Sequence, residues 1–144
     1  PNNGVITGEF GTVMTTVDGG EHWETRSPLV DEFYPQTAYF ENPQIGWIAG
    51  LGGVILHTTD GGESWTEQNT EAVVPLYGLE KVGDTMYVVG GEGTLLQYDG
   101  EQWRRVDHGK SIRLYIRAIR ALGETRAIVA GVGGALHIID ISGA

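Results

Sequence analysis

Residues 58–65 read TTDGGESW, and they repeat an earlier segment, TVDGGEHW at residues 16–23. Both follow the Asp-box pattern Ser/Thr-x-Asp-x-Gly-x-x-Trp, and the second box lies 42 residues after the first (60 − 18 = 42). A repeat of about 40 to 45 residues is typical of a β-propeller, in which each repeat forms one four-stranded blade. The period therefore predicts an all-β fold of antiparallel, four-stranded blades.

The residue types of the box suit a turn between two strands. An Asp carboxylate in a turn accepts hydrogen bonds from the backbone N–H groups that follow it. Glycine adopts positive φ without steric cost, and Trp buries a large ring between sheets. The third repeat keeps a shorter box at residues 99–103. We expect structural rather than catalytic roles for the box residues, which are Thr16, Asp18, Gly20, Trp23, Thr58, Asp60, Gly62, Trp65, Asp99 and Trp103.

A second pattern precedes each box or its remnant. Four short apolar runs end in Gly-x-x-Gly, and the first glycines of these patterns are separated by 42, 40 and 41 residues; they are Gly8, Gly50, Gly90 and Gly131. Each pattern stands between two apolar runs with no helix behind it, so it predicts a strand, a hairpin and a strand rather than a phosphate site.

The two patterns together divide the chain. The approximate repeats are residues 1–35, 36–74, 75–113 and 114–144, and they form a single propeller segment, 1–144, of about three and a half blades. We expect blades to begin with strands near 36–40, 75–82 and 114–122. Closed propellers usually have about four to eight blades. We therefore expect either the remainder of a longer propeller or association of copies into a homo-oligomer, and we favour the first.

Charge is distributed unevenly along the chain. Residues 1–103 hold two basic and sixteen acidic residues, a net charge of −14, whereas residues 104–126 hold seven basic and two acidic residues, a net charge of +5. With −1 from the remaining residues, the total is −10. An acidic body argues against nucleic-acid binding. The basic segment suits carboxylates of a protein or acidic peptide.

Four residues of the basic segment are candidate binding residues: Arg113, Tyr115, Arg117 and Arg120. Alternation along a strand places the first three on one side and Arg120 on the other. The first strand of a blade lines the central channel, so the former side would face the channel or its mouth. The alternative, in which these arginines pair with the protein's own carboxylates, stays open.

Other chemistries find little support in the sequence. The chain contains no Cys, which excludes disulfides and thiolate ligands. No apolar run is long enough to span a bilayer. The four histidines, His22, His57, His108 and His137, lack the spacing of metal ligands. We expect no catalytic residue, no metal site, no cofactor and no membrane span.

The residues of the second repeat resemble a known family. These are GWIAG at 46–50, GVILHTT at 53–59 and DGGESW at 60–65. They resemble the photosystem II stability and assembly factor family of β-propellers, and the wider bacterial set with bacterial-neuraminidase (BNR) repeats. The resemblance implies about seven blades in a complete ring. It also implies an extracytoplasmic location, namely the periplasm, the thylakoid lumen or the outside of the cell.

The same resemblance implies an assembly chaperone that binds a reaction-centre subunit, with an arginine-rich patch for which Arg113, Arg117 and Arg120 qualify by residue type. We therefore predict a non-enzymatic protein-binding scaffold or assembly factor. One alternative is a fragment of a sialidase-like glycoside hydrolase, for which Asp107 and Tyr115 add the necessary residue types. Another is a carbohydrate-binding or adhesion module that stacks sugars on Trp. The shared repeat position of Trp23, Trp65 and Trp103 favours core packing instead.

Overall fold

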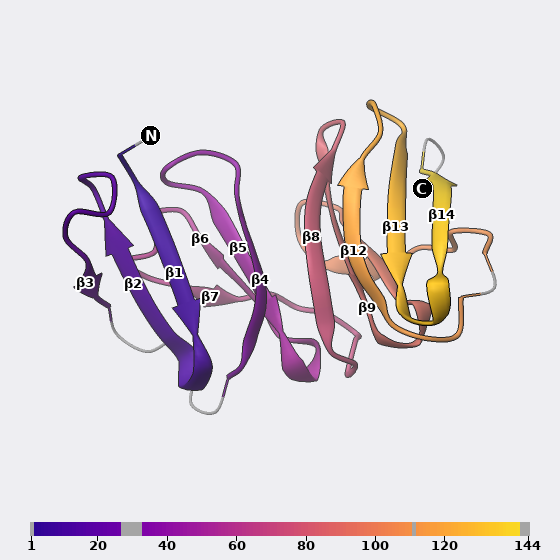
Figure 1. Ribbon diagram of the computed structural model, residues 1–144, viewed down its shortest axis with the longest axis horizontal. Coiled ribbons are helices and arrows are strands. Elements are labelled where there is room, and N and C mark those ends of the chain that lie inside the picture. The colour runs from indigo at the N-terminus through magenta and orange to yellow at the C-terminus, as the bar shows by residue number, and fades with distance from the viewer. Residues whose placement is uncertain (1, 27–32, 111, 142–144) are drawn as a thin grey trace.

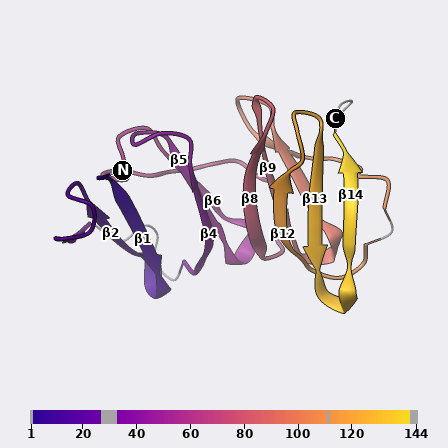
Figure 2. The same ribbon diagram turned by 45° about the horizontal axis from the view of Figure 1, so that its top comes forward.

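The computed structural model describes residues 2–26, 33–110 and 112–141, and within them the protein is built of β-strands joined by short turns (Figure 1). Four antiparallel sheets, which we number blades 1 to 4 in chain order, contain three, four, four and three strands. Figure 2 shows the sheets following one another from the first blade to the last. The predicted all-β class with four-stranded antiparallel blades is confirmed, and the outer two blades are partial.

The strands of each blade pair in the order in which they occur in the chain. Blade 1 contains β1 (Gly4–Gly8), β2 (Thr12–Thr16) and β3 (Glu24–Thr25). Blade 2 contains β4 (Pro35–Phe40), β5 (Gly46–Gly50), β6 (Ile55–Thr58) and β7 (Thr66–Glu67). Blade 3 contains β8 (Leu76–Val82), β9 (Thr85–Gly90), β10 (Leu95–Tyr98) and β11 (Trp103–Arg105). Blade 4 contains β12 (Ile116–Ala121), β13 (Arg126–Gly131) and β14 (Leu136–Asp140).

The first strands of blades 2, 3 and 4 are neighbours in space. Strand β8 packs against both β4 and β12, so these three form the inner row of the arc. Strands β4 and β8 begin within one residue of their predicted positions, and β12 begins two residues later than predicted. The outer strands β3, β7 and β11 are only two or three residues long. Short outer strands leave little unpaired backbone at the rim.

The hairpins explain the repeated glycines. A Cβ atom on Gly50, Gly90 or Gly131 would lie 2.2, 2.4 or 2.1 Å from a carbonyl oxygen of the segment that leads into the same blade. These glycines are required by close backbone approach. The last glycine of each pattern instead has positive φ, as at Gly53 (78°) and Gly93 (67°). Each hairpin thus needs glycine twice, for two different reasons.

Hydrogen bonds link each of two hairpins to the blade that follows. The Gly11 amide donates to the carbonyl of Phe33 at 2.9 Å, and the Gly93 amide donates to the carbonyl of Leu114 at 2.8 Å. Both acceptors lie just before the first strand of the next blade. Neighbouring blades are therefore held together by backbone as well as by side chains.

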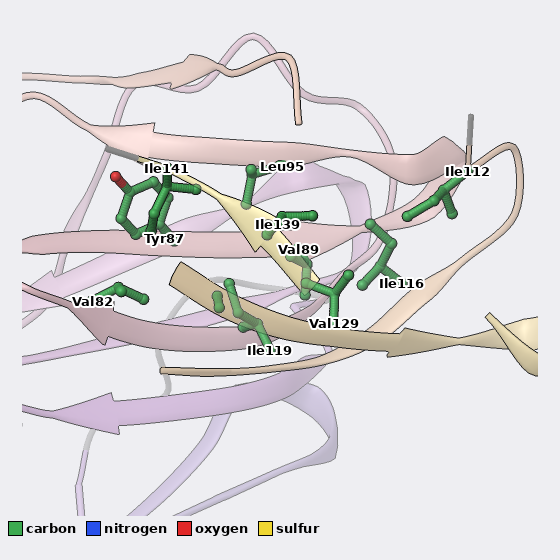
Figure 3. Close-up of a cluster of buried hydrophobic side chains, with 11 residues drawn as sticks. Val82, Tyr87, Val89, Leu95, Ile112, Ile116, Ile119, Val129, Ile139 and Ile141 are labelled. Atoms are coloured by element: carbon green, nitrogen blue, oxygen red, sulfur yellow. The ribbon is translucent and has the colours of Figure 1, made fainter. Parts of the chain in front are cut away.

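The core lies between the blades. Trp47, Ala49 and Ile55 of blade 2 are packed against blade 3, and the residues 40 positions later, Tyr87, Val89 and Leu95, are packed against blade 4. Figure 3 shows the second of these clusters, in which side chains from β9 and β10 meet those of β12, β13 and β14. Burial of these apolar side chains stabilises the stack by roughly 25 cal/mol per Å².

Within the described ranges, no helix has the length and apolar character that crossing a membrane requires.

Candidate functional site

The second Asp box forms a closed network of hydrogen bonds. The Asp60 carboxylate accepts from the Thr58 hydroxyl at 2.7 Å, from the Ser64 amide at 2.9 Å and from the Ser64 hydroxyl at 2.5 Å. The Gly62 amide donates to the Thr58 hydroxyl oxygen at 2.9 Å. The bonds from Ser64, with the one from Thr58, lower the pKa of Asp60 to about 2. The carboxylate is satisfied by its own turn, which suits a structural role.

The first box has the same pattern with a different last partner. Asp18 accepts from the Thr16 hydroxyl at 2.7 Å and the His22 amide at 3.0 Å, and its other oxygen pairs with the His22 ring at 2.7 Å. The hydrogen bond from the His22 amide is the main cause that lowers the pKa of Asp18 to about 2. Within the described residues, Asp18, Glu21 and His22 bring their ligand atoms within 4.8 Å of one another, and all three are exposed.

The Trp residues of the boxes pack against their blades. The Trp65 indole donates to the carbonyl of Gly62 at 3.2 Å and meets the Phe40 ring edge to face, with centroids 6.1 Å apart. Trp103 is fully buried against Tyr98, and Trp23 is half-buried. Stacking of sugars on exposed Trp faces is therefore not favoured.

Side chains from two neighbouring blades meet around Arg117. Its guanidinium carbon lies 4.1 Å from the centroid of the Tyr77 ring and 5.6 Å from that of Tyr115. The two tyrosine rings meet edge to face with centroids 5.8 Å apart. Tyr77 belongs to β8 of blade 3, whereas Arg117 belongs to β12 of blade 4. We call Tyr77, Tyr115 and Arg117, together with Arg113, which lies two residues before Tyr115 in the sequence, the Arg–Tyr patch.

Backbone contacts hold Tyr115 in place. Its carbonyl accepts from the Val132 amide at 3.0 Å, and the preceding carbonyl of Leu114 accepts from the Gly93 amide. A Cβ on Gly91 would lie 3.5 Å from the Tyr115 ring, an ordinary van der Waals contact, so the hairpin of blade 3 lies directly beside that ring. The segment that carries the patch is therefore fixed between the hairpins of blades 3 and 4.

The candidate arginines differ in their surroundings. Arg120 donates to the Glu80 carboxylate at 3.2 Å, and the same carboxylate accepts from the Ala121 amide at 3.1 Å. Arg113 and Arg117 are exposed, and within the described parts of the chain neither has a carboxylate oxygen within 4.0 Å. Arg120 thus takes the internal pairing that the sequence left open, while Arg113 and Arg117 have no carboxylate partner among the residues that the structure describes.

The alternation argument does not hold at this strand. β12 begins at Ile116, so Arg113 and Tyr115 precede it, and the register with β13 shifts between Ile116 and Ala118. Tyr115 and Arg117 nevertheless come together, and Arg117 also lies over the ring of Tyr77 in the neighbouring blade. Sequence reasoning missed Tyr77, although it lies 40 residues before Arg117, one repeat away.

Known proteins share the sequence pattern and the fold of this chain. The family model of the photosynthesis system II assembly factor YCF48 matches residues 1–78, more than half of the 144 residues. The structure of YCF48 bound to D1 peptide has a TM-score of 0.69 at 21% identity, with 95% of this chain and 51% of that chain covered. YCF48 from Cyanidioschyzon merolae has a TM-score of 0.68 at 26% identity, with 81% of this chain and 39% of that chain covered.

A more distant match shares the fold alone. The GH74 enzyme of Niastella koreensis has a TM-score of 0.52 at 16% identity, with 99% of this chain and 30% of that chain covered. No curated protein sequence matches the chain significantly. The chain spans about half or less of the length of these structures. The β-propeller resemblance inferred from the repeats is confirmed, and the chain belongs to the photosynthesis system II assembly factor YCF48 family.

Proposed function

We propose that this chain is a non-enzymatic protein-binding scaffold of the assembly-factor kind, and that its Arg–Tyr patch receives an acidic peptide segment. The observation that carries the proposal is the position of Arg117, stacked on Tyr77 with no carboxylate of the described residues within 4.0 Å. Aromatic stacking orients a guanidinium while leaving its N–H groups available, and two of those groups can donate to the two oxygens of one carboxylate.

The electrostatics of the whole chain support the same ligand. The protein carries a net charge of −10, yet the segment 104–126 carries +5. An acidic peptide is repelled by most of the surface and attracted to this one segment, which favours a single orientation of binding. Arg113 adds a second exposed cation close in sequence to Arg117.

The family gives the proposal its context. One structure that this chain resembles is YCF48 bound to D1 peptide, so a protein of this family has a peptide bound to it. By that likeness, this chain supplies part of a propeller that binds a partner protein during photosystem assembly. An extracytoplasmic location, such as the thylakoid lumen or the periplasm, is proposed on the same ground.

The sialidase-like alternative has less support. A sialidase-like site needs a Tyr hydroxyl beside a carboxylate. Tyr115 instead lies against Tyr77 and Arg117, and within the described residues no hydrogen bond involves its hydroxyl. Asp107 accepts from the Gly109 amide in its own turn at 2.8 Å. These contacts favour binding over catalysis.

The test uses a fluorescein-labelled peptide of alternating Glu and Ala, with binding followed by fluorescence anisotropy at low salt. The double variant Arg113→Gln/Arg117→Gln should weaken binding by at least about tenfold, because charge-assisted hydrogen bonds are lost. Arg104→Gln is the control, since it removes another exposed cation of the same segment, one that is already paired with Asp99. The acidic body attracts a peptide of alternating Lys and Ala without help from the patch, so the double variant should not weaken the binding of that peptide.

Thermal unfolding of the same variants separates binding from structure. If the double variant loses stability sharply while peptide capture stays at the wild-type level, the arginines are structural and the proposed site is wrong. Equal weakening by Arg104→Gln would also contradict it, because general charge attraction would then explain binding.

A further inference from the structure

A cavity of about 460 Å³ lies between blade 1 and blade 2. We call it the interblade cleft, and its walls include Val5, Thr15, Arg26, Phe40, Gln44 and Asp60. The two Asp boxes border it through Val17 and Gly61, so it opens at the end of the sheets where the boxes lie. Its volume falls within the range of about 300 to 1,000 Å³ that is common for ligand sites.

The repeat register explains why the cavity exists. Position 47 of blade 2 and position 87 of blade 3, which are 40 residues apart, are Trp and Tyr. The equivalent position of blade 1, 42 residues before Trp47, is Val5. At the interfaces of blades 2 and 3 with their following blades, Trp47 is 5% exposed and Tyr87 is 3% exposed. An aromatic ring thus fills this layer in two interfaces, and a small aliphatic side chain stands there in the first.

The neighbouring position shows the same change. The Trp47 ring stacks on His57, with centroids 4.6 Å apart, and meets Tyr98 at 6.4 Å. The residue equivalent to His57, again 42 positions earlier, is Thr15. Two rings are therefore replaced by an isopropyl group and a small hydroxyl side chain. Because protein interiors are close-packed, the space that these rings fill elsewhere is left as a cleft.

The walls of the cleft suit an aromatic guest. Phe40 supplies an aromatic wall that is itself braced against Trp65. Arg26 is held in place because its Nε donates to the Thr15 hydroxyl at 2.8 Å and its guanidinium pairs with Glu24 at 3.2 Å. Aromatic rings prefer edge-to-face contact with other rings and face contact with a guanidinium, and this cleft offers both partners.

We propose that the interblade cleft binds a Trp or Tyr side chain of a partner polypeptide. The protein itself indicates this occupant, because the equivalent space at the next two interfaces is filled by a Trp and a Tyr side chain. The cleft is reachable from outside, since Val17 on its border is 74% exposed. This site is separate from the Arg–Tyr patch and does not depend on the function proposed for it.

The experiment is an NMR titration of ¹⁵N-labelled protein with N-acetyl-tryptophanamide, with N-acetyl-leucinamide as the aliphatic control. The amides of Val5, Thr15 and Gly61 should shift with the aromatic probe and not with the aliphatic one. Val5→Trp places a ring in the cleft and should weaken binding of the probe by at least about tenfold. Val73→Trp is the matched control, because Val73 is 84% exposed and lies away from the cleft.

Two further variants address misfolding of Val5→Trp and binding at the Arg–Tyr patch. If Val5→Trp does not fold, Phe40→Leu removes the aromatic wall and should also weaken binding. The variant Arg113→Gln/Arg117→Gln should bind the probe like the wild type, which separates this site from the Arg–Tyr patch. Shifts that avoid the cleft, or undiminished binding by a folded Val5→Trp, would overturn the proposal. So would binding of free indole without binding of N-acetyl-tryptophanamide, since the cleft would then accept small molecules rather than a polypeptide side chain.

Discussion

Among the described residues, the turn carboxylates of Asp18, Asp60 and Asp99 are ionised more readily than usual. Hydrogen bonds within their own turns lower the pKa of Asp18 and of Asp60 to about 2, from an ordinary value of 3.8. For Asp99 the main cause of the same lowering is its hydrogen bond with Arg104. The charged form is therefore favoured in the folded protein over the unfolded chain.

The first prediction concerns pH. Because the folded pKa lies below the unfolded one, each carboxylate stabilises the fold fully above pH 3.8, and this contribution is lost as the pH falls toward about 2. The melting temperature should be flat from pH 7 to pH 5 and should fall between pH 4 and pH 2, by thermal unfolding followed with circular dichroism. Asp60→Asn should be less stable at pH 7 and should lose less between pH 4 and pH 2. An unchanged slope in this variant would contradict the assignment.

The second prediction concerns the left-handed position of the hairpins. Gly52 and Glu92 occupy the same position with φ of 71° and 56°. A non-glycine residue there costs roughly 1–2 kcal/mol, while glycine adds entropy to the unfolded chain. Glu92→Gly should therefore raise the free energy of unfolding by about 0.5 kcal/mol, and Gly52→Ala should lower it by about 1 kcal/mol. Denaturant titration measures both changes in the free energy of unfolding, and the prediction requires them to have opposite signs.

Single residues show what sequence reasoning could and could not foresee. The third box, at residues 99–103, is shorter than the other two, which alone leads us to expect a weaker turn around Asp99 than around Asp60. In the structure Asp99 accepts from the amides of Glu101 and Gln102 and from Arg104, as many donors as Asp60 has. The box pattern covers only the turn itself, so it does not include a side chain such as Arg104 that returns from the following strand.

At the scale of elements, side chains one repeat apart meet across neighbouring inner strands. Lys81 pairs with Glu41, and Arg120 pairs with Glu80, both over a separation of 40 residues. Tyr77 and Arg117 have the same separation. The repeat period that predicted the blades is therefore also the separation of these contacting residues, because equivalent positions of adjacent blades are neighbours in space.

The third prediction tests one of these contacts with a double-mutant cycle of Glu41→Gln and Lys81→Gln. The coupling energy should be about 0.2–1 kcal/mol at low salt and should shrink at 1 M salt, because exposed pairs are screened. Glu41→Gln combined with Arg120→Gln serves as the control, since these residues are not partners, and its coupling should be near zero. Equal couplings in both cycles would contradict a direct pair.

Strand positions were predicted well, whereas local register was not. β4, β8 and β12 each show a register shift near their first residues, at Pro35/Thr37, Leu76/Gly78 and Ile116/Ala118. A bulge of this kind breaks the two-residue alternation on which side-chain facing was argued. It recurs in three blades without a shared residue type, so the sequence offers no local signal for it.

For the molecule as a whole, the sheets follow one another in an arc, so a sheet at either end has a neighbouring sheet on one side (Figure 2). Leu95 of blade 3 is 1% exposed beneath blade 4, but the equivalent residue of blade 4, Leu136, is 65% exposed. Ile138 on the same strand is 51% exposed. The outer face of blade 4 is therefore an apolar surface of the kind that blades elsewhere cover.

The fourth prediction follows from this face. The 144-residue chain by itself should associate as its concentration rises, measured by light scattering coupled to size exclusion. Leu136→Lys/Ile138→Lys should shift the mass toward the monomer without lowering the melting temperature greatly, because both side chains are already exposed. Val73→Lys is the control for an isolated exposed residue. A monomeric wild type at high concentration would count against association through this face.

The backbone hydrogen bonds between hairpins and following blades also make it possible to measure how the blades separate from one another. The amide hydrogens of Gly11 and Gly93 are shielded only while a neighbouring blade stays docked, because their acceptors, Phe33 and Leu114, belong to the segments leading into that neighbour. Their rates of exchange with deuterated solvent therefore report undocking of individual blades. Gly11, beside the less filled interface, should exchange sooner than Gly93. We therefore expect blade 1 to separate from blade 2 before blade 3 separates from blade 4.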